Sequence, residues 1–227
     1  MPENNASTFA WKPVSLPCPV ALRGRYVTLE PLDAARHSAD LWAAVRGHDE
    51  LWRWMAQGPY SDATEMMDGL EQWRAANSAV LLAIVPGKPG RAAGWSSYMR
   101  IKPVHGVIEV GNVLFSPALQ RMREATEAMY LMARHVFEDL GYRRYEWKCN
   151  ADNEASRRAA LRLGFTFEGI FRQHMVVKGR SRDTAWFAML DKEWPARKRA
   201  FEKWLEPGNF DAEGRQRQSL GEIAQSN

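Results

Sequence analysis

Two arginines stand directly ahead of a helix-forming segment in the middle of the chain. Arg121 and Arg123 lie in SPALQRMREATEAMY, and a helix is expected from 124 to 140, with Thr126 in its first turn. The first N–H groups of a helix lack intrahelical partners and carry partial positive charge, so such an end binds phosphate. The sequence therefore indicates a pyrophosphate site. The alternative is a solvated basic turn balanced by Glu124 and Glu127.

Two further residues have the chemistry of proton acceptors. Glu109 lies on an expected strand over 106–115 and could take a proton directly or through water; the alternative is a surface or ion-paired glutamate on an edge strand. His174, in IFRQHMVVKG, belongs to the residue type whose ordinary pKa of about 6.5 suits a general base. A lone histidine is more often structural, and Cys149 on its strand is more often a small buried hydrophobic residue than a nucleophile.

These residues need a mixed α/β scaffold to bring them together. Alternating apolar patterns predict strands over 24–32, 79–85, 92–101, 106–115, 143–149, 165–171 and 184–190. Helical spacing and caps predict helices over 33–46, 49–57, 62–76, 124–140, 154–163 and 195–205. The expected fold is a single α/β (α+β) domain with a mixed central sheet of about six to seven strands and helices on both faces.

Composition sets the limits on this domain. The chain has 227 residues, 45% of them hydrophobic and 26% charged, with a formal net charge of +4. These values suit a soluble globular domain over 21–206, flanked by a flexible arm over 1–20 and a disordered polar tail over 207–227. Two cysteines, no signal peptide and no run of 18 apolar residues favour the cytoplasm and no membrane. The histidines and cysteines lack metal-ligand spacing, so no metal is expected.

Three motifs, in order, carry a resemblance to a known family. They are VGNVLFSPALQRMREATEA, then NEASRRAALRLGFTFEG, and finally KGRSRDTAWFAMLDKEW. From about Gly24 to Trp194 the sequence resembles the GNAT superfamily of acyl-CoA-dependent N-acyltransferases, and most of all its RimJ/RimL-like branch of ribosomal-protein N-terminal acetyltransferases. The resemblance implies a GNAT fold and acetyl-CoA as co-substrate, without a metal.

The resemblance also implies where the co-substrate binds. In that superfamily the loop follows Gln/Arg-x-x-Gly-x-Gly/Ala, so Gln120 takes the first place and Ala125 the last, while Arg123 and Arg121 stand where glycines are usual. Arginine tolerates a positive φ less well than glycine, so altered phosphate contacts are expected. The backbone of two strand residues would hold pantetheine as an added strand. The implied cofactor-binding residues are Val113, Phe115, Gln120, Arg121, Met122, Arg123, Glu124, Ala125, Thr126, Asn153 and Ser156.

The resemblance also implies a general acid and the walls of the acceptor pocket, whereas the candidate bases rest on residue type and position alone. Ser156 matches a hydroxyl placed near the CoA sulfur and is the expected general acid, although Asn153 could cap this helix and Ser156 simply fill its first turn. Glu109 and His174 are the candidate bases. Trp54 and Tyr60 are expected to wall the amine pocket, with cation–π contact if the amine is charged.

The expected partners are acetyl-CoA and an amine acceptor, which could be a protein N-terminus or a small molecule. The expected oligomeric state is a homodimer. Nucleic acid is not expected, because no RNA-binding motif accompanies the basic balance. Two alternatives stay open: a non-catalytic CoA-binding or sensing domain, and an acyltransferase that uses succinyl-CoA.

Overall fold

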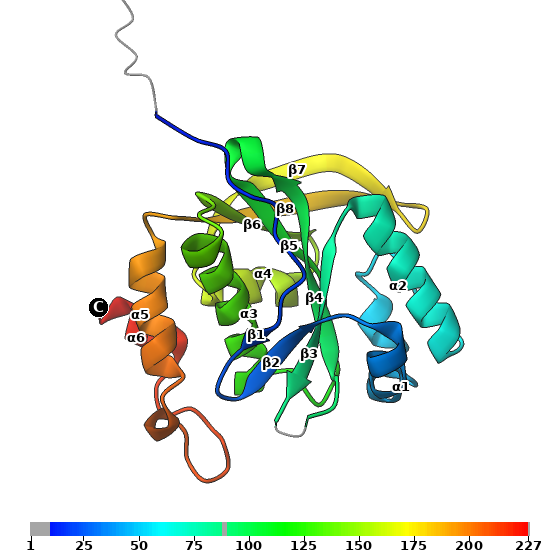
Figure 1. The fold of residues 1–227 in the computed structure, drawn as a ribbon, viewed down its shortest axis with the longest axis horizontal. Coiled ribbons are helices and arrows are strands. Elements are labelled where there is room, and N and C mark those ends of the chain that lie inside the picture. The colour runs from blue at the N-terminus through cyan, green and yellow to red at the C-terminus, as the bar shows by residue number, and fades with distance from the viewer. Residues whose placement is uncertain (1–9, 88–89, 227) are drawn as a thin grey trace, which may run out of the picture.

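The computed structural model describes residues 10–87 and 90–226, which form one sheet with helices packed on it (Figure 1). The strands are β1 Leu22–Arg23, β2 Val27–Pro31, β3 Val80–Pro86, β4 Gly94–Lys102, β5 Val107–Phe115, β6 Arg144–Asn150, β7 Thr166–Val177 and β8 Arg180–Leu190. The helices are α1 Ala34–Val45, α2 Ala63–Asn77, α3 Arg123–Arg134, α4 Glu154–Arg162, α5 Trp194–Trp204 and α6 Leu220–Gln225. Short helical turns are η1 Asp49–Trp52, η2 Pro103–His105, η3 His135–Asp139 and η4 Pro207–Asn209.

The predicted α/β fold with helices on both faces of a mixed sheet is confirmed. The described strands number eight, in the order β1-β2-β3-β4-β5-β6-β8-β7. The strand that the sequence pattern missed is β1, which has two residues and so cannot show an alternation. The helix expected over 124–140 is α3, which continues into the π-helical turn η3.

The sheet is antiparallel except where β5 and β6 run parallel, joined by α3. These two strands pair only from Val107 to Val110 against Arg144 to Trp147. Beyond those residues β5 has a bulge, with Asn112 at φ +49, and no further pairing with β6 is present in the described chain. We call this divergence the splay. It leaves the backbone of the second half of β5 without a partner on its β6 side.

Two apolar cores cover the two faces. α1, α2 and η1 pack on one face through residues that include Leu41, Trp52 and Leu70, together with Trp95 of β4. α3, α4, α5 and α6 share the second core on the other face, where the buried face of α3 is widest. Figure 1 shows α1 and α2 on one side of the sheet and α3, α5 and α6 on the other.

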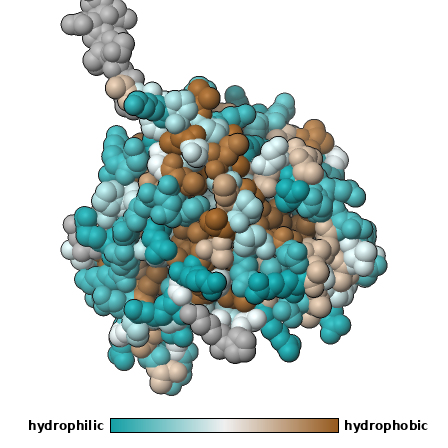
Figure 2. Space-filling model, in the orientation of Figure 1, coloured by the Kyte–Doolittle hydropathy of each residue, from teal (hydrophilic) through white to brown (hydrophobic). Residues whose placement is uncertain are grey.

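The described segments nearest the two chain ends are held more firmly than their composition suggests. Residues 1–9 of the expected flexible arm lie outside the described residues, but Trp11 Nε1 donates to the carbonyl of Val104 at 2.8 Å. Figure 2 shows apolar side chains gathered near the point where this N-terminal segment enters the fold. The tail expected to be disordered from 207 instead folds back, because Phe210, Leu220 and Ile223 insert into the α3-side core.

Candidate active site

The loop between β5 and α3 is a tight turn with one strained residue. The amides of Leu119 and Gln120 both donate to the carbonyl of Ser116, and that of Met122 to Leu119. Arg121 has φ +62, the left-handed conformation that glycine adopts most easily. The arginine therefore keeps the backbone shape that the glycine-type motif requires, and its exposed side chain makes no hydrogen bond with the described chain.

The first turn of α3 is open to an anion. α1, α2 and α4 are each capped by a side chain, from Asp33, Asp62 and Asn153 respectively. At α3 no side chain in the described chain caps the backbone N–H groups, and the N-cap residue is Met122. Those N–H groups keep their donor capacity and the positive end of the helix dipole, as the predicted pyrophosphate site needs.

Arg123 does not join Arg121 at this turn. Its guanidinium lies 4.2 Å from the ring centroid of Tyr26 and 5.3 Å from that of Phe210, and its Nε contacts Glu124 at 3.3 Å. The two arginines predicted to act together therefore point to different surroundings. In this conformation Arg123 supports the turn by cation–π packing.

Ser156 is both a helix residue and a held hydroxyl. Its backbone N–H donates to Asn153 Oδ1 at 3.1 Å, so Asn153 caps α4 as one of the two interpretations had it. Its Oγ accepts a hydrogen bond from Trp147 Nε1 at 2.9 Å, which leaves the hydroxyl proton able to donate. Cys149, two residues beyond Trp147 on β6, lies close enough for the Ser156 hydroxyl to lower the pKa of its thiol, but burial outweighs this and raises that pKa overall.

Glu109 lies in a buried cluster of charges on the other face of the sheet. Its carboxylate accepts from Lys148 Nζ at 2.8 Å and from Arg100 Nη1 at 3.1 Å. Lys148 also contacts Glu146 Oε2 at 2.7 Å, and Glu146 accepts from Arg144 Nε at 2.6 Å. Glu109 is thus ion-paired, as the alternative reading had it, but on a central strand rather than an edge strand.

His174 faces the same cluster from β7. Its Nδ1 lies 3.0 Å from Thr184 Oγ1, and its ring packs beside Trp186, over which Lys148 Nζ sits at 3.8 Å. Burial lowers the pKa of His174, and the positive charges of Arg100, Arg182 and Lys148 lower it further, with Arg100 the largest of these. The structure therefore brings Glu109 and His174 into one electrostatic environment, with the imidazole biased toward its neutral form.

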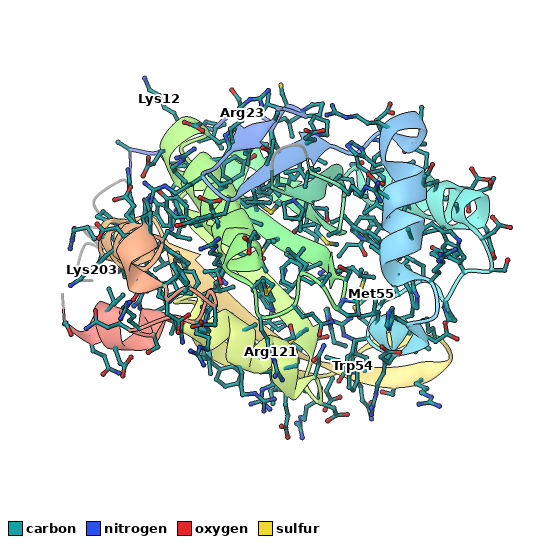
Figure 3. The ribbon with its side chains drawn as sticks, turned by 90° about the horizontal axis from the view of Figure 1, so that it is seen from below. Lys12, Arg23, Trp54, Met55, Arg121 and Lys203 are labelled. Atoms are coloured by element: carbon teal, nitrogen blue, oxygen red, sulfur yellow. The ribbon has the colours of Figure 1, made fainter. Side chains whose placement is uncertain are left out.

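The loop after η1 lies on the sheet face that carries Glu109 and His174, next to α2. Tyr60 packs edge-on against Trp52 with centroids 5.1 Å apart, and burial, with a smaller contribution from Glu65, raises the pKa of its phenol to about 12. The Tyr60 hydroxyl has no partner within the described residues. Trp54 is half-buried, and the turn after β7 reaches this loop because Lys178 Nζ donates to the carbonyl of Trp52 at 2.9 Å. Figure 3 shows Trp54 and Met55 beside the ribbon of β7.

Comparisons with known proteins agree with this geometry. The family described as Acetyltransferase (GNAT) domain matches residues 27–166, more than half of the chain. The chain belongs to the GNAT acetyltransferase family. A crystal structure of a GCN5-related N-acetyltransferase from Brucella melitensis is 45% identical, covers 95% of this chain and 99% of its own, and has a TM-score of 0.91. The family resemblance and the assignment as a transferase enzyme are therefore confirmed.

Curated relatives include ribosomal-protein acetyltransferases. Bacillus subtilis YdaF is 28% identical over 174 residues, which is 75% of this chain and 92% of its own. The ribosomal-protein-serine acetyltransferase of Escherichia coli is 31% identical over 86 residues, 38% of this chain and 48% of its own. This GNAT acetyltransferase thus has relatives with that named activity, at a similarity that assigns the family rather than the acceptor.

Several neighbours of the candidate bases in this acetyltransferase were not selected from its sequence. Lys148, Arg100, Arg182 and Trp186 surround the two candidate bases, yet none was selected as a site residue. Alternation along β6 could have identified one of them. Successive residues of a strand point to opposite faces, so Lys148 lies on the face away from Cys149, where the structure pairs it with Glu109. Within residues 10–87 and 90–226 no group of three potential ligands could hold a metal, and no helix is long and apolar enough to span a bilayer.

Proposed function

We propose that this chain transfers an acetyl group from acetyl-CoA directly to a primary amine. The observation that carries the proposal is the splay between β5 and β6. It separates the Ser156 hydroxyl on one face of the sheet from the candidate bases on the other face. Ser156 lies on the α4 side of β6, and Glu109 with His174 lies on the opposite side. A thioester that enters between β5 and β6 would reach both faces of the sheet.

The residues present fit CoA. The uncapped first turn of α3, with the left-handed turn at Arg121, offers the backbone N–H groups of Arg123, Glu124 and Ala125 to the pyrophosphate. The unpaired edge of β5 at Val113 and Phe115 offers main-chain groups to pantetheine, whose amides can bind as an extra strand would. Gln120 stabilises the connecting turn, because its Nε2 donates to the carbonyl of Phe115 at 3.1 Å.

Each chemical step then has a candidate group. The attacking amine must be neutral, the carbonyl polarised and the departing thiolate protonated. Ser156 would donate the proton to the thiolate, with its oxygen held by Trp147. His174, biased toward neutral imidazole, is the better candidate to receive the amine proton, because Glu109 must first give up a hydrogen bond to Lys148 or Arg100.

The acceptor we favour is the N-terminus of a protein, handled by a cytoplasmic enzyme. The relatives named as ribosomal-protein acetyltransferases support this choice. Trp54 and Tyr60 would line the path of the amine, and nucleic acid is not an expected partner because the sequence lacks an RNA-binding motif. A homodimer remains the expected assembly.

Turnover tests this function most directly. Purified protein would be incubated with acetyl-CoA and a panel of peptides and small amines, and released CoA thiol would be followed by absorbance. We expect amine-dependent thiol release. Tight binding of acetyl-CoA by calorimetry without release for any amine would instead support a CoA-binding or sensing domain, and no binding would refute the proposal.

One observation favours testing succinyl-CoA as the donor in parallel. Arg182, on β8, is close enough to Cys149, Arg100 and Glu109 for their charges to influence the pKa of its guanidinium, which burial lowers. Its Nε is buried and lacks a hydrogen-bond partner within the described residues. A carboxylate on the acyl group would satisfy it. If kcat/KM for succinyl-CoA exceeds that for acetyl-CoA and Arg182→Gln reverses the order, the donor is succinyl-CoA.

A further inference from the structure

The middle of β8 places a candidate base between two buried donors. Arg182, Thr184 and Trp186 alternate along this strand, so their side chains lie on one face of the sheet. Thr184 Oγ1 lies 3.0 Å from His174 Nδ1 and holds the imidazole at this point. Arg182 Nε and Trp186 Nε1, on either side of Thr184, are buried without a hydrogen-bond partner in the described part of the chain. Both groups can only donate, so each is suited to an oxygen atom of a bound molecule.

The ring of Trp186 is held in place by its neighbours. Its centroid lies 4.4 Å from that of Phe171 and 5.9 Å from that of His174. Lys148, at the paired position on β6, places its Nζ 3.8 Å from the same centroid. The direction of the indole N–H is therefore set by packing. A buried donor without a protein partner costs free energy, which indicates that a ligand supplies the missing oxygen.

The charges around His174 favour an amine that gives up its proton easily. Burial lowers the pKa of His174, and the positive charges of Arg100, Arg182 and Lys148 lower it further. Each of these charges has a larger effect than the opposing charge of Glu109. An ammonium group beside the imidazole is disfavoured for the same reason. At pH 7 roughly a tenth of an α-amino group is neutral, against less than about 0.1% of a lysine ε-amino group, so the site favours α-amines.

The unpartnered donors and the positive charge select the same chemical group. In an α-amino acyl group only the α-carbon and the carbonyl carbon separate the amine from the carbonyl oxygen. The amine can therefore face His174 while the oxygen meets the N–H of Trp186. A lysine ε-amine or a simple alkylamine has no oxygen at that separation.

We propose that the acceptor is an α-amino acyl group whose carbonyl oxygen binds Trp186 Nε1, with Arg182 as the second donor, and that Trp186 determines the preference for α-amines over ε-amines. The inference rests on the proposed function, because it names the acceptor class and a specificity-determining residue of the same site. A succinyl group would also engage Arg182, so Trp186 carries the test and acetyl-CoA is the donor throughout.

The test compares two acceptors, a short lysine-free peptide with a free N-terminus and Nα-acetyl-lysine amide. We expect kcat/KM of the unmodified protein to be at least about a hundredfold higher for the peptide. Trp186→Phe keeps an aromatic ring against Phe171 and removes the N–H. It should lower kcat/KM for the peptide about tenfold and leave that for acetyl-lysine amide within twofold, as loss of one buried hydrogen bond implies.

The matched control is Trp194→Phe, which makes the same change on the α3 side of the sheet. Trp194 packs there against Tyr130 and Phe137, and its Nε1 donates to Glu138 Oε1 at 2.7 Å. This variant should unfold at a lower urea concentration and keep the preference between the two acceptors. Trp186→Phe should shift the urea midpoint less, because the N–H that it removes has no partner among the described residues.

A binding measurement on the unmodified protein adds a readout that does not depend on turnover. The indole N–H resonance of Trp186, assigned from its absence in the spectrum of Trp186→Phe, should shift when the peptide binds and stay in place with acetyl-lysine amide. An unmoved resonance with the peptide, or an equal loss of kcat/KM for both acceptors in Trp186→Phe, would overturn this inference and leave the proposed function standing. Absence of turnover with any amine in the unmodified protein would overturn both.

Discussion

Glu127 anchors the helix that carries the proposed phosphate site, and its removal should be the most costly polar substitution near that site. The side chain is 4% exposed and accepts three backbone hydrogen bonds, from Arg25 N at 2.8 Å, Tyr26 N at 2.6 Å and Val27 N at 2.9 Å. Gly24 leaves room for it, because an added Cβ there would lie 2.5 Å from the carboxylate. The carboxylate thus ties the start of β2 to α3.

The free-energy cost of Glu127→Ala follows from these bonds. The Val27 N–H is buried and would stay unsatisfied, at about 1–3 kcal/mol, whereas the other two are partly buried and can reach water, at about 1 kcal/mol each. The expected loss is about 4 kcal/mol of unfolding free energy, or about 8–16 °C in Tm for a chain of this size. Glu127→Gln keeps one acceptor oxygen and should lose about half as much.

Urea unfolding followed by far-UV circular dichroism measures this loss. Glu154→Gln is the matched control, because Glu154 is exposed and pairs only with Arg158 across one turn, so it should shift stability by no more than about 0.5 kcal/mol. A loss below about 1 kcal/mol for Glu127→Ala would refute the reasoning, since it would mean that the three N–H groups find other partners at little cost.

Three further outcomes are expected. Ser156→Ala should lower kcat by roughly 10–10³-fold with folding intact. Trp147→Phe removes only the hydrogen bond to the Ser156 hydroxyl and should lower kcat by a smaller factor. An unchanged kcat in Ser156→Ala removes Ser156 from the mechanism. Because the folded pKa of His174 is lowered, its contribution to stability is complete above the unfolded pKa of about 6.5 and is lost as pH falls below it. His174→Gln should abolish this loss of stability at low pH, which urea unfolding midpoints across pH 5–8 measure. If His174 is the base, the substitution should also abolish the fall of kcat/KM at low pH, which rates over the same pH range measure. Phe210→Ala should cost about 3–5 kcal/mol by chemical denaturation, because the ring is buried against Trp204 and Tyr26, and a loss under 1 kcal/mol would show that the C-terminal segment is not part of the core.

The sequence predicted what depends on local pattern. Alternation and helical spacing located seven of the eight described strands and the helix α3, because each buries a regular stripe of apolar residues. The folded C-terminal segment was missed because Phe210, Leu220 and Ile223 are separated by polar residues and show no period. Their burial depends on packing against the neighbouring α5 and against α3, which lies far away in the sequence.

The site divides in the same way. Asn153 as a cap and the loop before α3 could be read from motif and spacing. The direction of Arg123 could not, because it is fixed by Tyr26 and Phe210 from opposite ends of the chain. The surroundings of Glu109 and His174 likewise come from β4, β6 and β8, whose neighbours are set by sheet order rather than by sequence distance.

Strand β6 explains why direct transfer is the simpler mechanism for this fold. Trp147 and Cys149 face α4, where Trp147 holds Ser156, whereas Glu146 and Lys148 face the charge cluster that includes Glu109. One strand at the splay therefore separates the proposed acid, Ser156, on one face of the sheet from the candidate bases on the other. A covalent route through Cys149 would need the thiolate, but burial raises the pKa of that thiol. It would also need a base on the α4 side, whereas His174 faces Lys148 and Trp186 across the sheet. Under the proposed function, the arrangement thus favours attack by the amine itself, from the side on which Trp54 and Tyr60 are expected to line its path.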